Sequence, residues 1–227
     1  NGDQLGGAVS TSTDGSTGNV TFDLLTCGSL TCASAAGTTT VTGAAVITGA
    51  ISKSASGDLT FSSTSDVNGN ITVSGGNLTM ADGASLAGTT LNFSGAGTIN
   101  IGNVNFDGGG ATGVTMDAAT DFTGTISIAD ATTVTLTGTP TIVDTLTVGG
   151  GASCSLTTSG AANIDANVDV QAGASMTLAA SSTISSTTVD FNGAGTIAIG
   201  NVTFDGTTQG VTVDAATDFT GTISIAD

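Results

Sequence analysis

His, Trp, Tyr, Arg and Glu are absent from this sequence of 227 residues, and Lys53 is its only basic residue. All 18 acidic residues are Asp. Enzymes draw their acids, bases and nucleophiles mostly from His, Glu, Lys, Tyr and Cys, so general acid–base chemistry would here depend on Asp. We therefore expect a protein that is not an enzyme and that binds no catalytic cofactor.

Aromatic residues and long apolar runs are also scarce. All 8 aromatic residues are Phe, so a wide globular core would lack its usual large side chains. No run of about 18 apolar residues is present, so we expect no membrane insertion. The formal net charge of −17 repels phosphate backbones and anionic membranes, so we also expect no nucleic-acid partner.

Three cysteines give an odd count, with Cys27 and Cys32 close together in LTCGSLTC and Cys154 far away. The spacing of the first two does not match a CxxC pair, and no His completes a zinc site. Two interpretations stay open. The thiols are small buried apolar side chains, or Cys27 and Cys32 form a disulfide or a crosslink to a neighbouring chain.

A tandem repeat is the main signal in the sequence. The stretch FSGAGTINIGNVNFDGGGATGVTMDAATDFTGTISIAD ends at Asp130 and returns, with few changes, as a stretch that ends at Asp227. The offset is about 97 residues. We divide the chain into an N-terminal joining segment (1–37) and two β-repeat modules (38–130 and 131–227). Because the last module ends with the chain, we expect the parent protein to be longer.

Inside each module, apolar residues come in pairs separated by one small polar residue, as in Ile71/Val73 and Leu78/Met80. This alternation is typical of short half-buried strands, and the Gly, Asn, Asp and Ser clusters between the pairs are typical of turns. No stretch has helical periodicity. Pro140 is the only proline, and we expect it at an edge or in a turn because it cannot donate to a ladder.

The pairs fall into three series, each advancing by roughly 19 to 23 residues. A recurrence of this length predicts an all-β fold, a parallel β-solenoid whose coils contain roughly 20 residues. The series in module 1 are Leu59, Leu78, Ile99; Val67, Leu86, Val104; and Ile71, Leu91, Val114. Their counterparts in module 2 are Leu156, Met176, Ile197; Ile164, Ile184, Val202; and Val168, Val189, Val211.

Two resemblances add to this prediction. The segments NGDQLGGAV and TTTVTGAAVITGAI resemble the low-complexity shafts of bacteriophage tail fibres, whose family implies an intertwined homotrimer on a virion. The segments NGNITVSGGNLTMADGASLAG and GAGTINIGN resemble the parallel β-helices of bacterial adhesins and autotransporter passengers. Both resemblances imply an extracellular, extended protein that serves reach and attachment.

Asp117 and Asp121 bracket DAATD, which recurs with Asp214 and Asp218. Two carboxylates at this spacing could share Ca²⁺ with loop carbonyls, because calcium prefers six to eight oxygen ligands. The alternative is a turn in which Asp accepts hydrogen bonds from its own backbone.

A further pair, Asp165 and Asp169, raises the possibility of a polysaccharide-cleaving site. Glycosidases need one carboxylic acid that stays protonated in an apolar pocket. The sequence offers no Trp or Tyr for sugar stacking and no His or Arg for positioning a sugar, so we do not expect such a site in this segment.

We therefore expect a non-enzymatic shaft of an extracellular or virion fibre that supports host attachment. A bacterial surface adhesin, or a self-stacking extracellular filament subunit, is the alternative. Self-association as a homotrimer or end to end is the expected partnership, and any host receptor would contact other parts of the parent protein.

Overall fold

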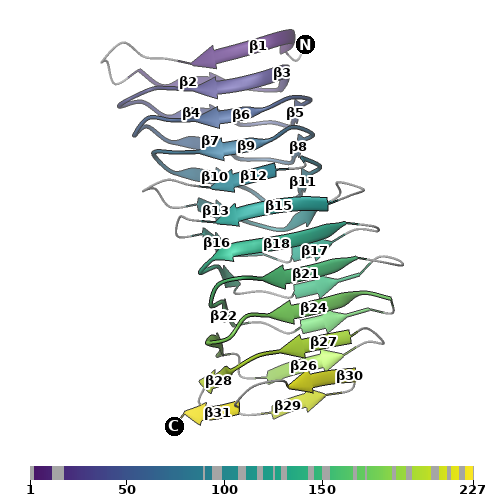
Figure 1. Ribbon diagram of the computed structural model, residues 1–227. Coiled ribbons are helices and arrows are strands. Elements are labelled where there is room, and N and C mark those ends of the chain that lie inside the picture. Colours follow the sequence, from purple (N-terminus) through teal and green to yellow (C-terminus); the bar gives the residue numbers. More distant parts are fainter. Residues whose placement is uncertain are drawn as a thin grey trace.

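The computed structural model describes residues 3–11, 18–88, 90–93, 99–106, 111–116, 120–124, 126–128, 132–142, 146–149, 154–165, 168–171, 173–185, 188–192, 196–205, 210–213, 216–219 and 223–226. In these residues the chain forms short strands and no helix, as predicted. The strands stack as rungs of a parallel β-solenoid, with the N-terminus at one end and the C-terminus at the other (Figure 1).

Each coil contributes three successive strands, which stack in three columns. Column 1 is a sheet of 11 strands. Its members are β2 (Val20–Phe22), β4 (Thr39–Val41), β7 (Leu59–Phe61), β10 (Leu78–Met80), β13 (Ile99–Ile101), β16 (Thr120–Phe122), β19 (Thr141–Ile142), β22 (Asn163–Ile164), β25 (Ser182–Ile184), β28 (Val202–Asp205) and β31 (Ile223–Ala226).

Columns 2 and 3 belong to one sheet of 20 strands, because the long strand β3 (Leu25–Cys32) pairs with the first strand of each column and with β1 (Asp3–Thr11). Column 2 contains β5 (Ala45–Ile47), β8 (Ser65–Val67), β11 (Ala84–Leu86), β14 (Val104–Phe106), β17 (Ile126–Ile128), β20 (Leu146–Val148), β23 (Val168–Val170), β26 (Thr188–Asn192) and β29 (Gly210–Val213). Column 3 contains β6 (Ile51–Lys53), β9 (Ile71–Val73), β12 (Thr90–Phe93), β15 (Ala111–Met116), β18 (Thr133–Gly138), β21 (Ser155–Thr158), β24 (Ser175–Leu178), β27 (Thr196–Ile199) and β30 (Ala216–Phe219).

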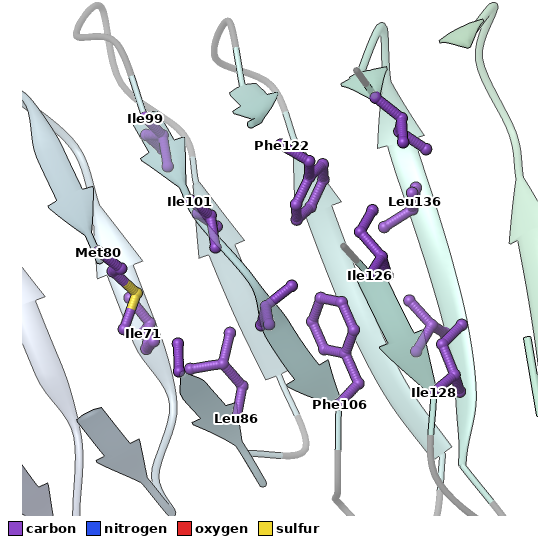
Figure 2. Close-up of a cluster of buried hydrophobic side chains, with 14 of the residues drawn as sticks. Ile71, Met80, Leu86, Ile99, Ile101, Phe106, Phe122, Ile126, Ile128 and Leu136 are labelled. Carbon is purple, nitrogen blue, oxygen red and sulfur yellow. The ribbon is translucent and has the colours of Figure 1, made fainter. Parts of the chain in front are cut away.

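The core is a thin stack of side chains along the solenoid axis. In a typical three-residue strand such as β7, the first and third side chains are buried and the middle one is half-buried on the outer surface. Figure 2 shows how residues of successive coils, among them Ile101 and Phe122, meet in this interior. Burying one such side chain stabilises the fold by about 1.5 to 3 kcal/mol, and each coil needs its neighbours for that burial.

The predicted joining segment also contains strands. Residues 3–11 form β1 and residues 20–32 contain β2 and β3, and all three pair with strands of the next coil. Pro140 immediately precedes β19 and its carbonyl accepts a hydrogen bond from Asn163 N at 3.0 Å. Pro140 therefore lies just outside β19, and its place at an edge or in a turn stays a prediction.

The ladder register confirms part of the predicted series. Leu78 lies opposite both Leu59 and Ile99, and Leu91 lies opposite both Ile71 and Val114. Met176 likewise lies opposite both Leu156 and Ile197. The other three series were wrong by two residues at one step: the actual pairs are Leu86 with Phe106, Ile184 with Phe204, and Val168 with Phe191. A shift of two residues keeps the same side chains inside, so the alternation alone does not determine which register forms.

Equivalent strands of the two modules lie on different faces of the solenoid. Residues 59–61 form β7 in column 1, whereas the equivalent residues 156–158 belong to β21 in column 3. Likewise β8 in column 2 corresponds to β22 in column 1. Equivalent strands are therefore fourteen strands apart, which is not a whole number of three-strand coils. In the second module each equivalent strand consequently lies one column back in the order in which the chain visits the columns.

Candidate functional site

The most unusual interior group is Lys53, whose side chain is only 1% exposed at the end of β6. Its backbone pairs with Cys32 in the preceding coil and with Val73 in the following one. Its Nζ donates hydrogen bonds to the carbonyl of Ala55 and, at 3.1 Å, to that of Gly75. The ammonium group thus forms hydrogen bonds with turn carbonyls of two successive coils. The sequence analysis did not predict this burial of Lys53.

The Cys32 thiol interacts with this lysine, and the Cys27 thiol interacts with Cys32. Burial raises the pKa of Cys32, while the Thr11 and Thr39 hydroxyls and the Lys53 charge oppose that rise. Burial also raises the pKa of Cys27, and Cys32 adds to that rise. The Thr11 and Thr39 hydroxyls are 2.9 Å apart and share a hydrogen bond. Raised thiol pKa values oppose nucleophilic reactivity, so this cluster is suited to packing rather than to catalysis.

Burial lowers the pKa of the Lys53 amine, and the charges of Cys32 and Asp58 partly offset this effect. Between the lowered pKa of the folded chain and the ordinary value of 10.5, the unfolded chain binds more protons. The contribution of Lys53 to the free energy of unfolding therefore rises with pH through this window, and the burial penalty is fully present below it.

We expect the free energy of unfolding of the native chain to rise relative to that of Lys53→Met as the pH approaches 10.5. Urea unfolding of both proteins at several pH values from 7 upward measures this difference. Ionisation of Cys27 and Cys32 in the unfolded state is common to both proteins and largely cancels. A difference that stays constant or falls with pH would show that the amine is not buried as described.

Cys27, Cys32 and Cys154 are each at most 2% exposed, and a Cys27–Cys32 disulfide or a crosslink to a neighbouring chain stays a prediction. We expect an aromatic disulfide reagent to modify the native chain at least about 100-fold more slowly than a free thiol, because the thiols are buried. In denaturant three thiols per chain should react. A count of one would instead establish the disulfide.

Carboxylates and amides cap the turns beside column 1. Asp58 Oδ1 accepts a hydrogen bond from Asn77 N at 3.2 Å, and Asp82 Oδ1 accepts one from Asn103 N at 2.9 Å. Asn19 Oδ1 likewise accepts a hydrogen bond from Thr38 N at 3.0 Å. These side chains link neighbouring coils. This role differs from the local turn that the sequence analysis weighed for Asp117, Asp121, Asp214 and Asp218 as an alternative to metal binding.

The calcium prediction falls mainly outside the described residues. Asp117 and Asp214 lie there entirely, while the backbones of Asp121 and Asp218 belong to β16 in column 1 and β30 in column 3. Within the described part of the chain, no group of three or more His, Cys, Asp or Glu residues could hold a metal ion. Calcium binding at these four residues stays a prediction.

The other candidate regions offer little acid–base chemistry. Asp165 follows β22 in column 1 and Asp169 lies in β23 in column 2, so the pair spans two columns. An open hollow on the outside of column 2 is lined by small residues: Gly83, Ala84, Ser85, Asn103, Val104, Asn105 and Ser127. None of these lining side chains titrates near neutral pH.

No protein family, curated protein or solved structure that was compared with this chain matches it. Among the described residues, no helix is long and apolar enough to cross a membrane. The arrangement of the residues themselves therefore carries the functional argument.

Proposed function

We propose that this chain is a non-enzymatic shaft segment of an extracellular or virion fibre that supports attachment to a host surface. The observation that carries the proposal is the unbroken parallel ladder, which joins both modules without a gap at their boundary: β15 pairs with β18 and β17 with β20. A rod of this kind resists bending because every coil is hydrogen-bonded to the next. Eleven stacked strands give it a length of about 50 Å.

The interior and the surface also suit a spacer. Apolar side chains fill the axis, and the outer positions hold mostly Thr, Ser, Asn and Asp. A net charge of −17 supports solubility of a long fibre. Trp, Tyr and Arg side chains, which usually dominate binding hot spots, are absent from the sequence, and the Phe side chains that the structure describes are buried or half-buried. Receptor contacts are therefore assigned to other parts of the parent protein.

A single-chain adhesin or self-stacking filament is the second candidate. It is favoured by the observation that each coil pairs with coils of the same chain, so that the solenoid needs no partner strand. Light scattering coupled to size exclusion distinguishes the two. A trimer that survives detergent supports the tail-fibre type of shaft, and a monomer or a growing polymer supports the adhesin or filament.

The location of the protein tests the proposal itself. Immunogold labelling of the source cells or particles, with an antibody raised against this chain, should decorate filamentous appendages outside the cell or on the virion. Labelling confined to the cell interior would contradict an extracellular shaft.

A further inference from the structure

Both ends of the solenoid are open edges of its sheets. In column 1, β2 is the first strand and β31 the last, and each pairs with a single neighbour among the described strands. The other edges are β1 at one end and β29 with β30 at the opposite end (Figure 1). An edge strand offers a row of N–H and C=O groups to any strand that can lie beside it.

The last strand of column 1 exposes apolar side chains that a further strand would cover. Ile223 and Ile225 of β31 are 47% and 78% exposed. The same tripeptide, Ile-Ser-Ile, forms β17, where Ile126 and Ile128 are at most 1% exposed. The difference lies in the neighbours, because β17 is flanked by β14 and β20, whereas β31 has β28 on one side only. The sequence of β31 is thus suited to a strand that is covered on both sides.

The first strand of column 1 presents a matching apolar surface at the opposite end. Val20 and Phe22, the first and third residues of β2, are only half-buried. Residues 18–23 read GNVTFD, and residues 200–205, which contain β28, have the same sequence. β28 pairs with β31 within the chain. The sequence of β2 is therefore already known to pack against β31 from its other side.

The order of the columns also continues from one end to the other. Each coil visits columns 1, 2 and 3 in turn, and β31 lies in column 1. The next strand therefore belongs on column 2. β1 of a second copy fits this place, because β1 pairs along β3 through columns 2 and 3, and β2 then returns to column 1. The described strands make up whole coils, so a second copy continues every column without a step.

We propose that β31 binds β2 of a second copy of this chain, head to tail, while β29 and β30 bind the second copy's β1. In the register of the other column 1 ladders, Ile223 lies opposite Val20 of the second copy and Ile225 lies opposite its Phe22. A contact between two different surfaces does not close on itself, so its repetition gives a filament. The inference rests on the filament candidate of the proposed function and specifies its contact.

The hydrogen bonds of this junction follow from those inside column 1. Leu59 N, at the start of β7, donates at 2.9 Å to the carbonyl of Asn77, which immediately precedes β10 in the next coil. Asn19 precedes β2 in the same way. Ile223 N of one copy therefore donates to the Asn19 carbonyl of the next copy. The junction repeats a ladder that the chain already forms between its own coils.

Light scattering coupled to size exclusion, over a range of chain concentrations, tests the proposal. We expect the native chain to grow from 21.5 kDa into multiples of that mass, and to associate more strongly when added salt screens the repulsion between copies of net charge −17. Ile225→Lys should raise the dissociation constant at least about 100-fold, because the junction would bury an unpaired ammonium group.

The matched control is Val46→Lys, which changes the net charge by the same amount. Val46 is also exposed, at 36%, but it is the middle residue of β5 on the outside of column 2. This variant should associate like the native chain. Circular dichroism and urea unfolding establish that both variants are folded.

A mixture of variant and native chains tests the polarity of the contact. Ile225→Lys keeps an intact β2, so it should bind β31 of the native chain and stop growth there. An excess of this variant should therefore reduce the native polymers to dimers. In a tail-to-tail contact between two β31 strands, the variant would leave the native polymers unchanged.

Each of three results would overturn the proposal. A folded native chain that stays monomeric, or that forms a closed trimer, contradicts both the junction and the filament candidate. Equal association of Ile225→Lys and Val46→Lys contradicts the junction but leaves a filament with another contact. Native polymers that an excess of Ile225→Lys does not shorten contradict the head-to-tail polarity. The location of the protein, tested by immunogold labelling, is independent of all three results.

Discussion

Replacing Gly57 with Ala is expected to lower the free energy of unfolding by at least about 2 kcal/mol, because the new methyl group has no room. A Cβ at this buried position would overlap the carbonyl oxygen of Gly37 and lie 2.7 Å from that of Ser34. The Gly57 N–H also donates to the Ser34 carbonyl at 3.0 Å. Accommodating the methyl group would therefore push two hydrogen-bonded coils apart.

Gly7→Ala is the matched control for Gly57→Ala, since a Cβ at Gly7 meets no atom within 4 Å. Its effect should stay within about 0.5 kcal/mol. Urea unfolding followed by circular dichroism measures both variants. Equal midpoints for Gly57→Ala and Gly7→Ala would show that the coils are not in contact at this corner.

Phe122→Ala is expected to destabilise the chain by about 3 to 5 kcal/mol, the range for removing a fully buried aromatic ring. Phe122 is 0% exposed in column 1, and its ring meets that of Phe106 from column 2 at a centroid distance of 6.4 Å and an interplanar angle of 69°. Figure 2 shows both rings in the interior between the columns. The variant loses this edge-to-face contact and leaves a cavity on the axis.

The control for Phe122→Ala is Thr147→Ala, a change at an outward position of β20. It should alter the free energy of unfolding by no more than about 0.5 kcal/mol. A denaturant titration measures both variants. If Phe122→Ala lowered the free energy of unfolding no more than this control, the ring could not be packed in the interior of the solenoid.

The fold class was predictable because two independent periods agree in this sequence. Alternation of apolar residues, as in Ile99 and Ile101, marks the strands, and the recurrence of roughly 20 residues marks the coil. A less obvious signal also fits the structure: Gly18, Gly37, Gly57 and Gly76 each precede a column 1 strand by two residues. The interval between successive glycines of this set equals the length of one coil. These glycines lie at a corner where the backbones of neighbouring coils come close together.

The details that were missed have physical reasons. The pairing of Leu86 with Phe106 was missed because a parallel ladder can shift by two residues without exposing an apolar side chain, so the alternation fits both registers. The rotation between modules was missed because the predicted series treated equivalent residues, such as Leu59 and Leu156, as occupants of one face. The burial of Lys53 depends on turn carbonyls in two different coils, which no local pattern reveals.

The most direct test of the account is a pair of distances along column 1, measured by pulsed electron paramagnetic resonance. Spin labels at Thr40→Cys and Thr141→Cys should be separated by five strand spacings, about 24 Å, and labels at Thr40→Cys and Thr203→Cys by eight spacings, about 38 Å. The buried native thiols should stay unlabelled. A difference near 14 Å between the two distances supports a continuous solenoid that can act as a shaft. Equal distances, or a shorter second distance, would contradict it.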